Sequence, residues 1–377
     1  MAAGTFLPPS KYTLNDIFNQ YKTNENYQQI ILSSVDQTIN DISAGKLTNS
    51  STTLGNIEYY RSSINQIKLP VLEMGEHQLV VIKCQFFDPN PNMQQYKNPI
   101  GSGGHKKIYI VLLVSTDPTK RGKNASIFCW GKSIPQSIRQ QTNFEREIAI
   151  QKNLPDDICV KLLGDCHFDG KNNNMRIGTL MEYIPSNLFL KINDGTIRNL
   201  SKEQIGNLFR NLLVILFNLN IQNIRHGDIK LENILADDEM NVKLCDFGYA
   251  LLLTESKEFF YPRGSELYSS PEDISEFKVH YDTKSDMWAM GIVFFMICYG
   301  GHFVKDSLVP LCKDWEKLEK TINNALATCI PGSHAGPFIP LIRNMLTVDP
   351  EWRPSAKIGI DVLNQIVKSF TSSEQNR

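Results

Sequence analysis

The pattern of hydrophobic and polar positions divides the chain into two regions of different character. In residues 1–95, Asn, Gln, Ser and Thr are abundant, and hydrophobic residues recur at helical spacing. The stretch Leu47–Thr53 is predicted as a loop and Leu79–Lys83 as a strand. One or two amphipathic helices are predicted on Leu14, Ile17, Phe18 and Tyr21 and on Tyr27, Ile30, Ile31, Val35, Ile39 and Ile42. These helices are expected to pack against the following domain, with binding of a regulatory partner as the alternative.

From residue 96 onward the pattern changes twice. Short runs of strand length come first, between residues 96 and 183, and long segments with helical periodicity dominate after residue 200. This order predicts an α+β chain with a small strand-rich lobe and a larger helical lobe, joined near Met181–Pro185. Met287–Val304 is almost uncharged and about as long as a short membrane span. Because it contains three glycines and His302, we interpret it as a buried helix.

Composition narrows the class of protein. The formal net charge of -1 provides no basic field for nucleic acid binding. The eight cysteines occur singly, without a CxxC pair, so neither a zinc site nor a disulfide framework is predicted. The first ten residues lack the charged and apolar segments of a secretory signal. A cytoplasmic protein with no membrane span is therefore expected, with a nuclear location as the alternative.

Two short polar motifs carry the candidate chemistry. Asp228 follows a His-Gly pair, Asn233 lies five residues later, and Asp246 begins an Asp-Phe-Gly run. Phosphoryl transfer requires a carboxylate that orients the attacking hydroxyl, and oxygen ligands for Mg²⁺ beside the phosphates. The two motifs resemble H-R-D-x-x-x-x-N and D-F-G of eukaryotic-type protein kinases. The resemblance implies that Asp228 is the catalytic base, that Asn233 and Asp246 hold Mg²⁺, and that Lys230 neutralises the transferred phosphate, as in serine/threonine kinases.

The resemblance also implies an ATP site. A glycine-rich run resembles the phosphate-covering loop G-x-G-x-x-G-x-V, although Lys106 replaces its third glycine. Lys132 is expected to hold the α- and β-phosphates and to pair with Glu147, with Glu145 as the alternative carboxylate. Trp130 stands where the family has a small residue against adenine, which predicts a crowded pocket or a bulged strand. The residues assigned to the nucleotide are the loop positions Ile100, Gly101, Gly103, Gly104 and Ile108, then Lys132, the hinge residues Met181, Glu182 and Ile184, and Leu235 as the floor of the base site.

A third segment, Gly264–Glu272, resembles the end of a kinase activation segment. The resemblance implies that Glu272 pairs with Arg353 and that Asp286 anchors the catalytic loop. Gly227 stands where the family has an arginine that binds a phosphate on the activation segment. Phosphorylation of that segment is therefore expected to have less control over activity.

These features predict a bilobal α+β protein-kinase-like fold with a mostly helical N-terminal extension. The expected divisions are residues 1–95 for the extension, 96–368 for the kinase domain, with lobes 96–180 and 186–368, and 369–377 for a polar tail. The predicted function is a serine/threonine kinase that uses ATP and Mg²⁺ on protein substrates. The alternatives are a pseudokinase that binds partners without catalysis, and phosphoryl transfer to a small molecule.

Overall fold

The computed structural model describes residues 106–115, 126–169, 175–254, 264–275, 282–304, 308–328 and 336–374, the strand segments 47–49, 51–55, 57–62, 68–74, 77–83 and 101–102, and residues 36, 40 and 44. The chain divides into two compact units. The first comprises Met1–Lys152 and Lys161–Tyr183, and the second Asn153–Val160 and Ile184–Arg377.

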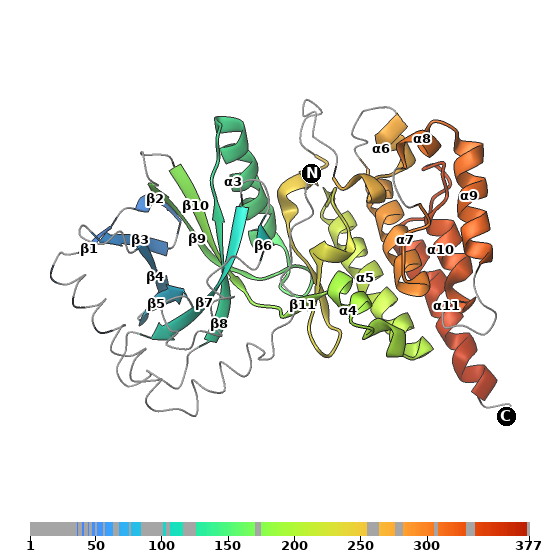
Figure 1. Cartoon of the computed structure of the whole chain (residues 1–377), viewed down its shortest axis with the longest axis horizontal. Coiled ribbons are helices and arrows are strands. Elements are labelled where there is room, and N and C mark those ends of the chain that lie inside the picture. The colour runs from blue at the N-terminus through green and yellow to red at the C-terminus, as the bar shows by residue number, and fades with distance from the viewer. Residues whose placement is uncertain are drawn as a thin grey trace. The chain divides into compact units, whose positions relative to one another are not determined.

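A ten-stranded sheet forms the described framework of the first unit (Figure 1). The strand order is β1-β3-β4-β5-β7-β8-β10-β9-β2, with β6 paired to β7, and the paired neighbours run antiparallel. The strands are β1 (Leu47–Asn49), β2 (Ser51–Gly55), β3 (Ile57–Ser62), β4 (Lys68–Met74), β5 (His77–Lys83), β6 (Gly101–Ser102), β7 (Lys106–Ser115), β8 (Ser126–Ser133), β9 (Leu162–Asp169) and β10 (Met175–Glu182).

Part of the N-terminal extension belongs to this sheet. The predicted strand Leu79–Lys83 is confirmed as part of β5, which pairs with β7. The predicted loop Leu47–Thr53 is wrong, because this stretch contributes to β1 and β2. A "mostly helical" extension is therefore also wrong for residues 47–83, and the predicted division at residue 96 falls within the sheet. The helices predicted between residues 14 and 42 lie outside the described residues.

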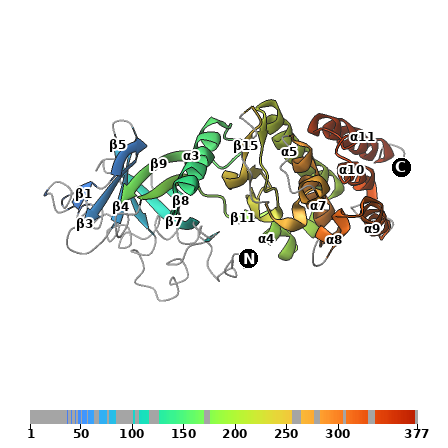
Figure 2. The ribbon, with the colours of Figure 1, turned by 90° about the horizontal axis from the view of Figure 1, so that it is seen from above.

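Helix α3 (Ile138–Asn153) lies along strands β8–β10 of the same unit (Figures 1 and 2). Its Lys152 forms an ion pair with Asp165 of β9. The buried face of the helix contains hydrophobic side chains together with the carboxylate of Glu147 and the amide of Gln151. Because buried polar groups need partners, this face carries specific contacts as well as packing.

The described part of the second unit is mainly helical (Figures 1 and 2). Helix α5 begins with a capping box in which Ser201 and Gln204 satisfy each other's backbone N–H groups. Its Phe209 stacks on Phe294 of α7 at a centroid distance of 3.7 Å. The helices are α4 (Leu188–Asn193), α5 (Lys202–Ile221), α6 (Pro271–Ser275), α7 (Lys284–Tyr299), α8 (Val309–Cys312), α9 (Trp315–Ala327), α10 (Ile339–Met345) and α11 (Ala356–Glu374).

Helix α7 contains most of the uncharged segment that begins at Met287. Residues on all sides of this helix are buried within the unit, so the interpretation as a buried helix is confirmed. Among the described helices, none has the length and apolar character that would let it cross a membrane.

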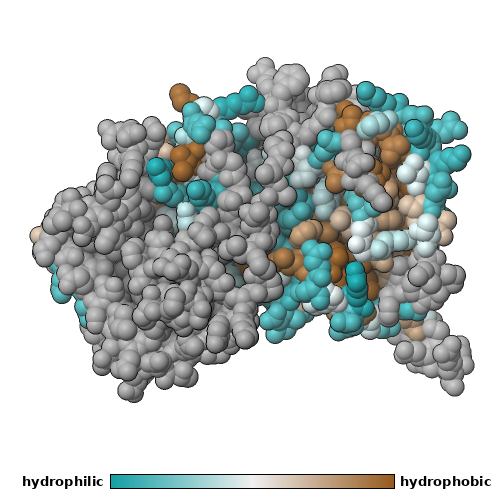
Figure 3. Space-filling view, viewed as in Figure 1, coloured by the Kyte–Doolittle hydropathy of each residue, from teal (hydrophilic) through white to brown (hydrophobic). Residues whose placement is uncertain are grey.

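Helix α9 shows the opposite pattern. Leu318, Ile322 and Leu326 are buried along one side, at the i, i+4, i+8 spacing of a helix face. Hydrophilic residues gather on the surface where this helix lies (Figure 3). Its amphipathic sequence therefore fixes α9 at the edge of the unit.

Five short strands frame the polar motifs of the second unit. The predicted catalytic loop, residues 226–233, connects β12 to β13, and Asp246 lies between β14 and β15. The strands form two small sheets, β11 (Ser186–Asn187) with β13 (Ile234–Ala236) and β14 (Val242–Leu244), and β12 (Ile224–Arg225) with β15 (Leu251–Leu252). A sheet-based unit and a helical unit confirm the predicted α+β class.

Candidate active site

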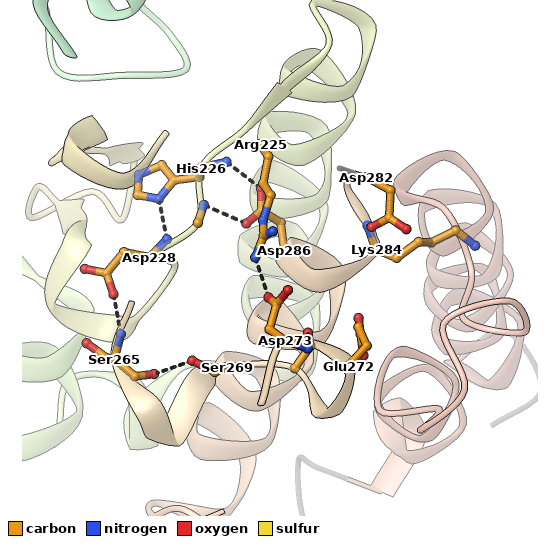
Figure 4. Close-up of polar contacts among 12 residues, drawn as sticks. Arg225, His226, Asp228, Ser265, Ser269, Glu272, Asp273, Asp282, Lys284 and Asp286 are labelled. Atoms are coloured by element: carbon orange, nitrogen blue, oxygen red, sulfur yellow. Dashed lines mark hydrogen bonds and ion pairs between the residues drawn. The ribbon is translucent and has the colours of Figure 1, made fainter. Parts of the chain in front are cut away.

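The catalytic loop is held by a carboxylate from α7. Asp286 is buried, and its Oδ2 accepts a hydrogen bond from the backbone N–H of His226 at 2.6 Å. Its Oδ1 accepts from the backbone N–H of Gly227 at 3.0 Å (Figure 4). The predicted anchor is therefore confirmed, and it fixes the backbone directly before Asp228.

Asp228 is the point at which three polar groups converge. Its Oδ1 accepts a hydrogen bond from the backbone N–H of Ser265 at 2.8 Å (Figure 4). Its Oδ2 accepts from Lys230 Nζ at 2.6 Å and from Asn233 Nδ2 at 3.0 Å. The residue is only 4% exposed, so these contacts orient a carboxylate that is largely removed from bulk water.

Lys230 connects this carboxylate to the activation-segment residue Ser265, whose Oγ lies 2.9 Å from Lys230 Nζ. Burial lowers the pKa of Lys230, but the carboxylates of Asp228, Asp246 and Glu232 outweigh burial and raise the pKa above its usual value. The ammonium therefore stays charged at neutral pH. A fixed positive charge beside the carboxylate of Asp228 is suited to neutralising a phosphoryl group.

Asn233 and Asp246 present the oxygen chemistry that Mg²⁺ prefers. Asn233 uses its amide N–H groups on the backbone carbonyl and the carboxylate of Asp228, so its side-chain oxygen is the atom suited to a metal. Asp246 has a left-handed backbone with φ of 65°. Its charge contributes to the raised pKa of Lys230, and it adds to burial and to the charge of Asp228 in raising the pKa of Tyr249.

The residues therefore fit a Mg²⁺ ion that takes its remaining ligands from phosphate and water. No group of three or more His, Cys, Asp and Glu side chains suited to a metal occurs within the described ranges. A Mg²⁺ ion bound together with ATP does not require such a cluster, because such an ion is usually held by one or two carboxylates and the substrate phosphates.

The residues predicted to contact the base lie in different elements. Met181 is buried in β10, and Leu235 lies in β13. The backbone N–H of Glu182 donates to the carbonyl of Lys161 at 3.0 Å, so the backbone atom of Glu182 suited to a base is its carbonyl oxygen. Ile184 follows the last strand of the first unit and belongs to the second.

The glycine-rich loop is described in part. Gly101 lies in β6 opposite Ile108 of β7. The predicted contacts from Ile100, Gly103 and Gly104 lie outside the described residues.

The ion pair made by Glu147 differs from the prediction. Glu147 is only 4% exposed, and its carboxylate accepts a hydrogen bond from the ammonium of Lys106. The assignment of Lys132 as the partner of Glu147 is corrected to Lys106, which begins β7. The choice of Glu147 over Glu145 agrees with this contact, since Glu145 lies instead beside His167, 3.4 Å away.

Two buried ion pairs support the second unit. The predicted pair of Glu272 with Arg353 is confirmed as a bidentate contact, with N–O distances of 2.7 and 2.9 Å. Sequence reasoning missed the second pair, in which Arg225 donates to Asp273 (Figure 4). The position of Arg225 directly before the His-Gly-Asp run was the available signal.

Comparisons with known proteins agree with this geometry. A sequence model of the protein kinase domain matches residues 96–364. The carbon catabolite-derepressing protein kinase of Candida glabrata is 27% identical over 68% of this chain and 39% of its own length. The probable serine/threonine-protein kinase MARK-B of Dictyostelium discoideum is 28% identical over 56% of this chain and 29% of its own length. The carbon catabolite-derepressing protein kinase of Saccharomyces cerevisiae is 26% identical over 68% of this chain and 37% of its own length. The chain thus spans well under half the length of these relatives.

Proposed function

Because the chain belongs to the protein kinase family, we propose that it transfers the γ-phosphoryl group of ATP to serine and threonine hydroxyls of protein substrates. The family uses ATP and a divalent metal, typically Mg²⁺. Its relatives with the names above are protein kinases, and MARK-B is named as a probable serine/threonine kinase.

The observation that carries the proposal is the set of contacts around Asp228. One carboxylate oxygen is used by the N–H of Ser265, and the other by Lys230 and Asn233. A base held in this way is oriented before a substrate arrives, so binding does not have to order it. The serine/threonine assignment is based on the position of Lys230, two residues after Asp228. The contacts of Lys230 with Asp228 and Ser265 support this assignment.

In the proposed reaction, Asp228 orients the substrate hydroxyl and accepts its proton. Asn233 and Asp246 hold Mg²⁺, which neutralises charge on the phosphates when bound. Lys230 stabilises negative charge on the group in transfer. The described cysteines are not joined by disulfides, which supports a reducing cytoplasmic or nuclear location as part of the proposal.

The experiment measures MgATP turnover by the full chain with generic protein substrates such as casein, beside an Asp246→Asn control. We expect phosphoserine and phosphothreonine to form, and turnover to require Mg²⁺ and Asp246. Saturating MgATP should also raise the melting temperature of the wild-type protein, and less so in the Asp246→Asn variant. Absence of both turnover and thermal stabilisation at millimolar MgATP would favour the pseudokinase alternative. Exclusive phosphorylation of tyrosine would contradict the serine/threonine assignment.

A further inference from the structure

The ammonium of Lys106 compensates a charge that is costly to bury alone. Glu147 lies on α3 with its side chain 5% exposed, and Lys106 Nζ forms an ion pair with its Oε1. An unpaired carboxylate in this position would carry a large desolvation cost. The first residue of β7 is therefore fixed to α3, the long helix among the described residues of this unit, as the lysine of the kinase small lobe is fixed to its helix glutamate.

Strand register explains why Lys106 meets Glu147. In the antiparallel pair of β7 and β8, Lys106 lies opposite Ser133 and Ile108 lies opposite Gly131, without a register shift. Side chains alternate between the faces of a sheet, and directly paired residues share a face. Lys106, Ile108 and Gly131 therefore lie on one face, and Lys132 lies on the other.

Trp130 shares the face of Lys132. It is buried in a hydrophobic cluster with Val111, Cys166 and Leu180. Gly178 makes room for the indole, because a Cβ at position 178 would lie 2.2 Å from Trp130 Cζ2. Trp130 thus does not occupy the position of the small residue in the family strand V-A-I-K. A shift of one residue brings Cys129 to the small position and Gly131 to the lysine position.

Position 131 has no room for the family's lysine. A Cβ built on Gly131 would lie 2.4 Å from Thr179 Oγ1 and 3.1 Å from Met181 Cε. A contact of 2.4 Å is too short for real atoms, so a longer side chain requires Thr179 to move. The strand that carries the lysine in the family has a glycine on this face, and the neighbouring strand provides an ammonium on the same face.

We infer that Lys106, not Lys132, is the lysine of this chain that orients the phosphates of ATP, held in position by Glu147. This inference rests on the proposed kinase function and assigns one of its parts. Lys106 stands at the third glycine position of the phosphate-covering loop, so the loop itself supplies the positive charge. The lysine that the family has on the strand of Gly131 is therefore moved to the neighbouring strand in this chain, and is not lost.

The first test uses an acyl phosphate of ATP on the wild-type protein, so it needs no variant. An unprotonated lysine amine near the phosphates attacks the acyl carbonyl and forms an amide, and ATP leaves with the bonding electron pair on its phosphate oxygen. Peptide mass spectrometry then identifies the acylated lysine with and without competing MgATP. We expect MgATP-protected labelling at Lys106. Protected labelling at Lys132, or at neither lysine in protein that turns over ATP, would overturn the inference.

The second test compares Lys106→Met with Lys132→Met and with Lys107→Met, a control that removes the neighbouring charge. Nucleotide affinity is measured by direct titration with MgATP, and turnover by kcat/KM. Lys106→Met is expected to lower kcat/KM by about 10²- to 10³-fold, similar to the usual effect of removing one hydrogen-bond donor that stabilises charge in a transition state, and to weaken MgATP binding. Both other variants should remain within a few-fold of the wild type.

The outcomes separate the inference from the function on which it rests. Wild-type protein without turnover or nucleotide binding contradicts the proposed function itself. Active wild-type protein whose Lys132→Met variant loses turnover, while Lys106→Met keeps it, contradicts only the assignment of Lys106. If Lys106→Met does not fold, the labelling of the wild-type protein decides alone.

Discussion

Asp228 shows how much of the proposed chemistry depends on single atoms. Its carboxylate accepts a backbone N–H, an ammonium and an amide N–H, and each donor comes from a different residue. The donors hold the carboxylate in one orientation, as is required of a base that receives a hydroxyl proton. Replacement by asparagine keeps the size of the side chain and removes this basicity.

We predict that Asp228→Asn lowers kcat by about 10²- to 10⁴-fold, the usual contribution of a general base, and leaves MgATP affinity nearly unchanged. The measurement pairs steady-state kinetics with a nucleotide titration on the same preparation. Turnover equal to the wild type would remove Asp228 from its role. A loss of affinity as large as the loss of rate would show a structural effect instead.

At the scale of elements, one buried ion pair connects α6 to the segment before α11. Glu272 and Arg353 are each 1% exposed, and Arg353 also donates to the backbone carbonyls of Thr347, Lys284 and Val348. Burial raises the pKa of Glu272, but hydrogen bonds and the charge of Arg353 outweigh it, so the pKa lies below its ordinary value. The folded state therefore favours the ionised carboxylate.

We predict that Glu272→Gln lowers the free energy of unfolding by about 3–5 kcal/mol at neutral pH, because it leaves the charge of Arg353 buried without its carboxylate. The measurement is denaturant unfolding at a series of pH values. Adding Arg353→Met to Glu272→Gln should recover part of the loss, since the double variant buries no unpaired charge.

The pH dependence of this effect has a definite sign. A carboxyl whose folded pKa is lowered contributes stability above its ordinary pKa of 4.5, and that contribution is lost as pH falls through the folded pKa. The difference between the wild type and Glu272→Gln should therefore be largest at neutral pH and shrink in acid. A difference that grows as pH falls would contradict the pKa direction.

At the scale of the whole molecule, contacts within the chain hold the described end of the predicted activation segment, residues 264–272. Lys230 and Asp228 bind Ser265 at its end, and Arg225 pairs with Asp273 just beyond it. Gly227 cannot simply be exchanged for the arginine of the family. Its φ is 77°, and a Cβ there would lie 2.8 Å from the carbonyl oxygen of Tyr249.

We predict that phosphatase treatment leaves most of the kinase activity of the full chain, because internal carboxylates and not phosphates satisfy these cations. The assay compares turnover before and after treatment, with removal of phosphate checked by mass spectrometry. Gly227→Arg should lower stability and should not make activity depend on phosphate. Near-complete loss of activity, restored by rephosphorylation, would refute this account.

The sequence predicted groups that lie within one continuous motif better than groups that meet across strands. Asp228, Lys230 and Asn233 are separated by a few residues, so local chain geometry brings them together wherever the loop forms. The pair of Glu272 and Arg353 is 81 residues apart, yet each half stands in a motif of its own. By contrast, the strands that include Leu47–Thr53 were missed, because the polar residues of this stretch predicted a loop and the partner strands decide its conformation.

The sequence by itself determined the family, the α+β class and the order of the polar groups, because these depend on residue types at short spacings. Only the tertiary structure decided which lysine meets Glu147. Lys106 lies in β7 and Lys132 in its partner strand β8. A change of one residue in the register of two paired strands moves a side chain to the opposite face of the sheet. The sequence of β8 alone does not show which of its residues lie on the face of Lys106, because the pairing with β7 decides this. The indole of Trp130 in the core and the lack of space at Gly131 fix the same arrangement.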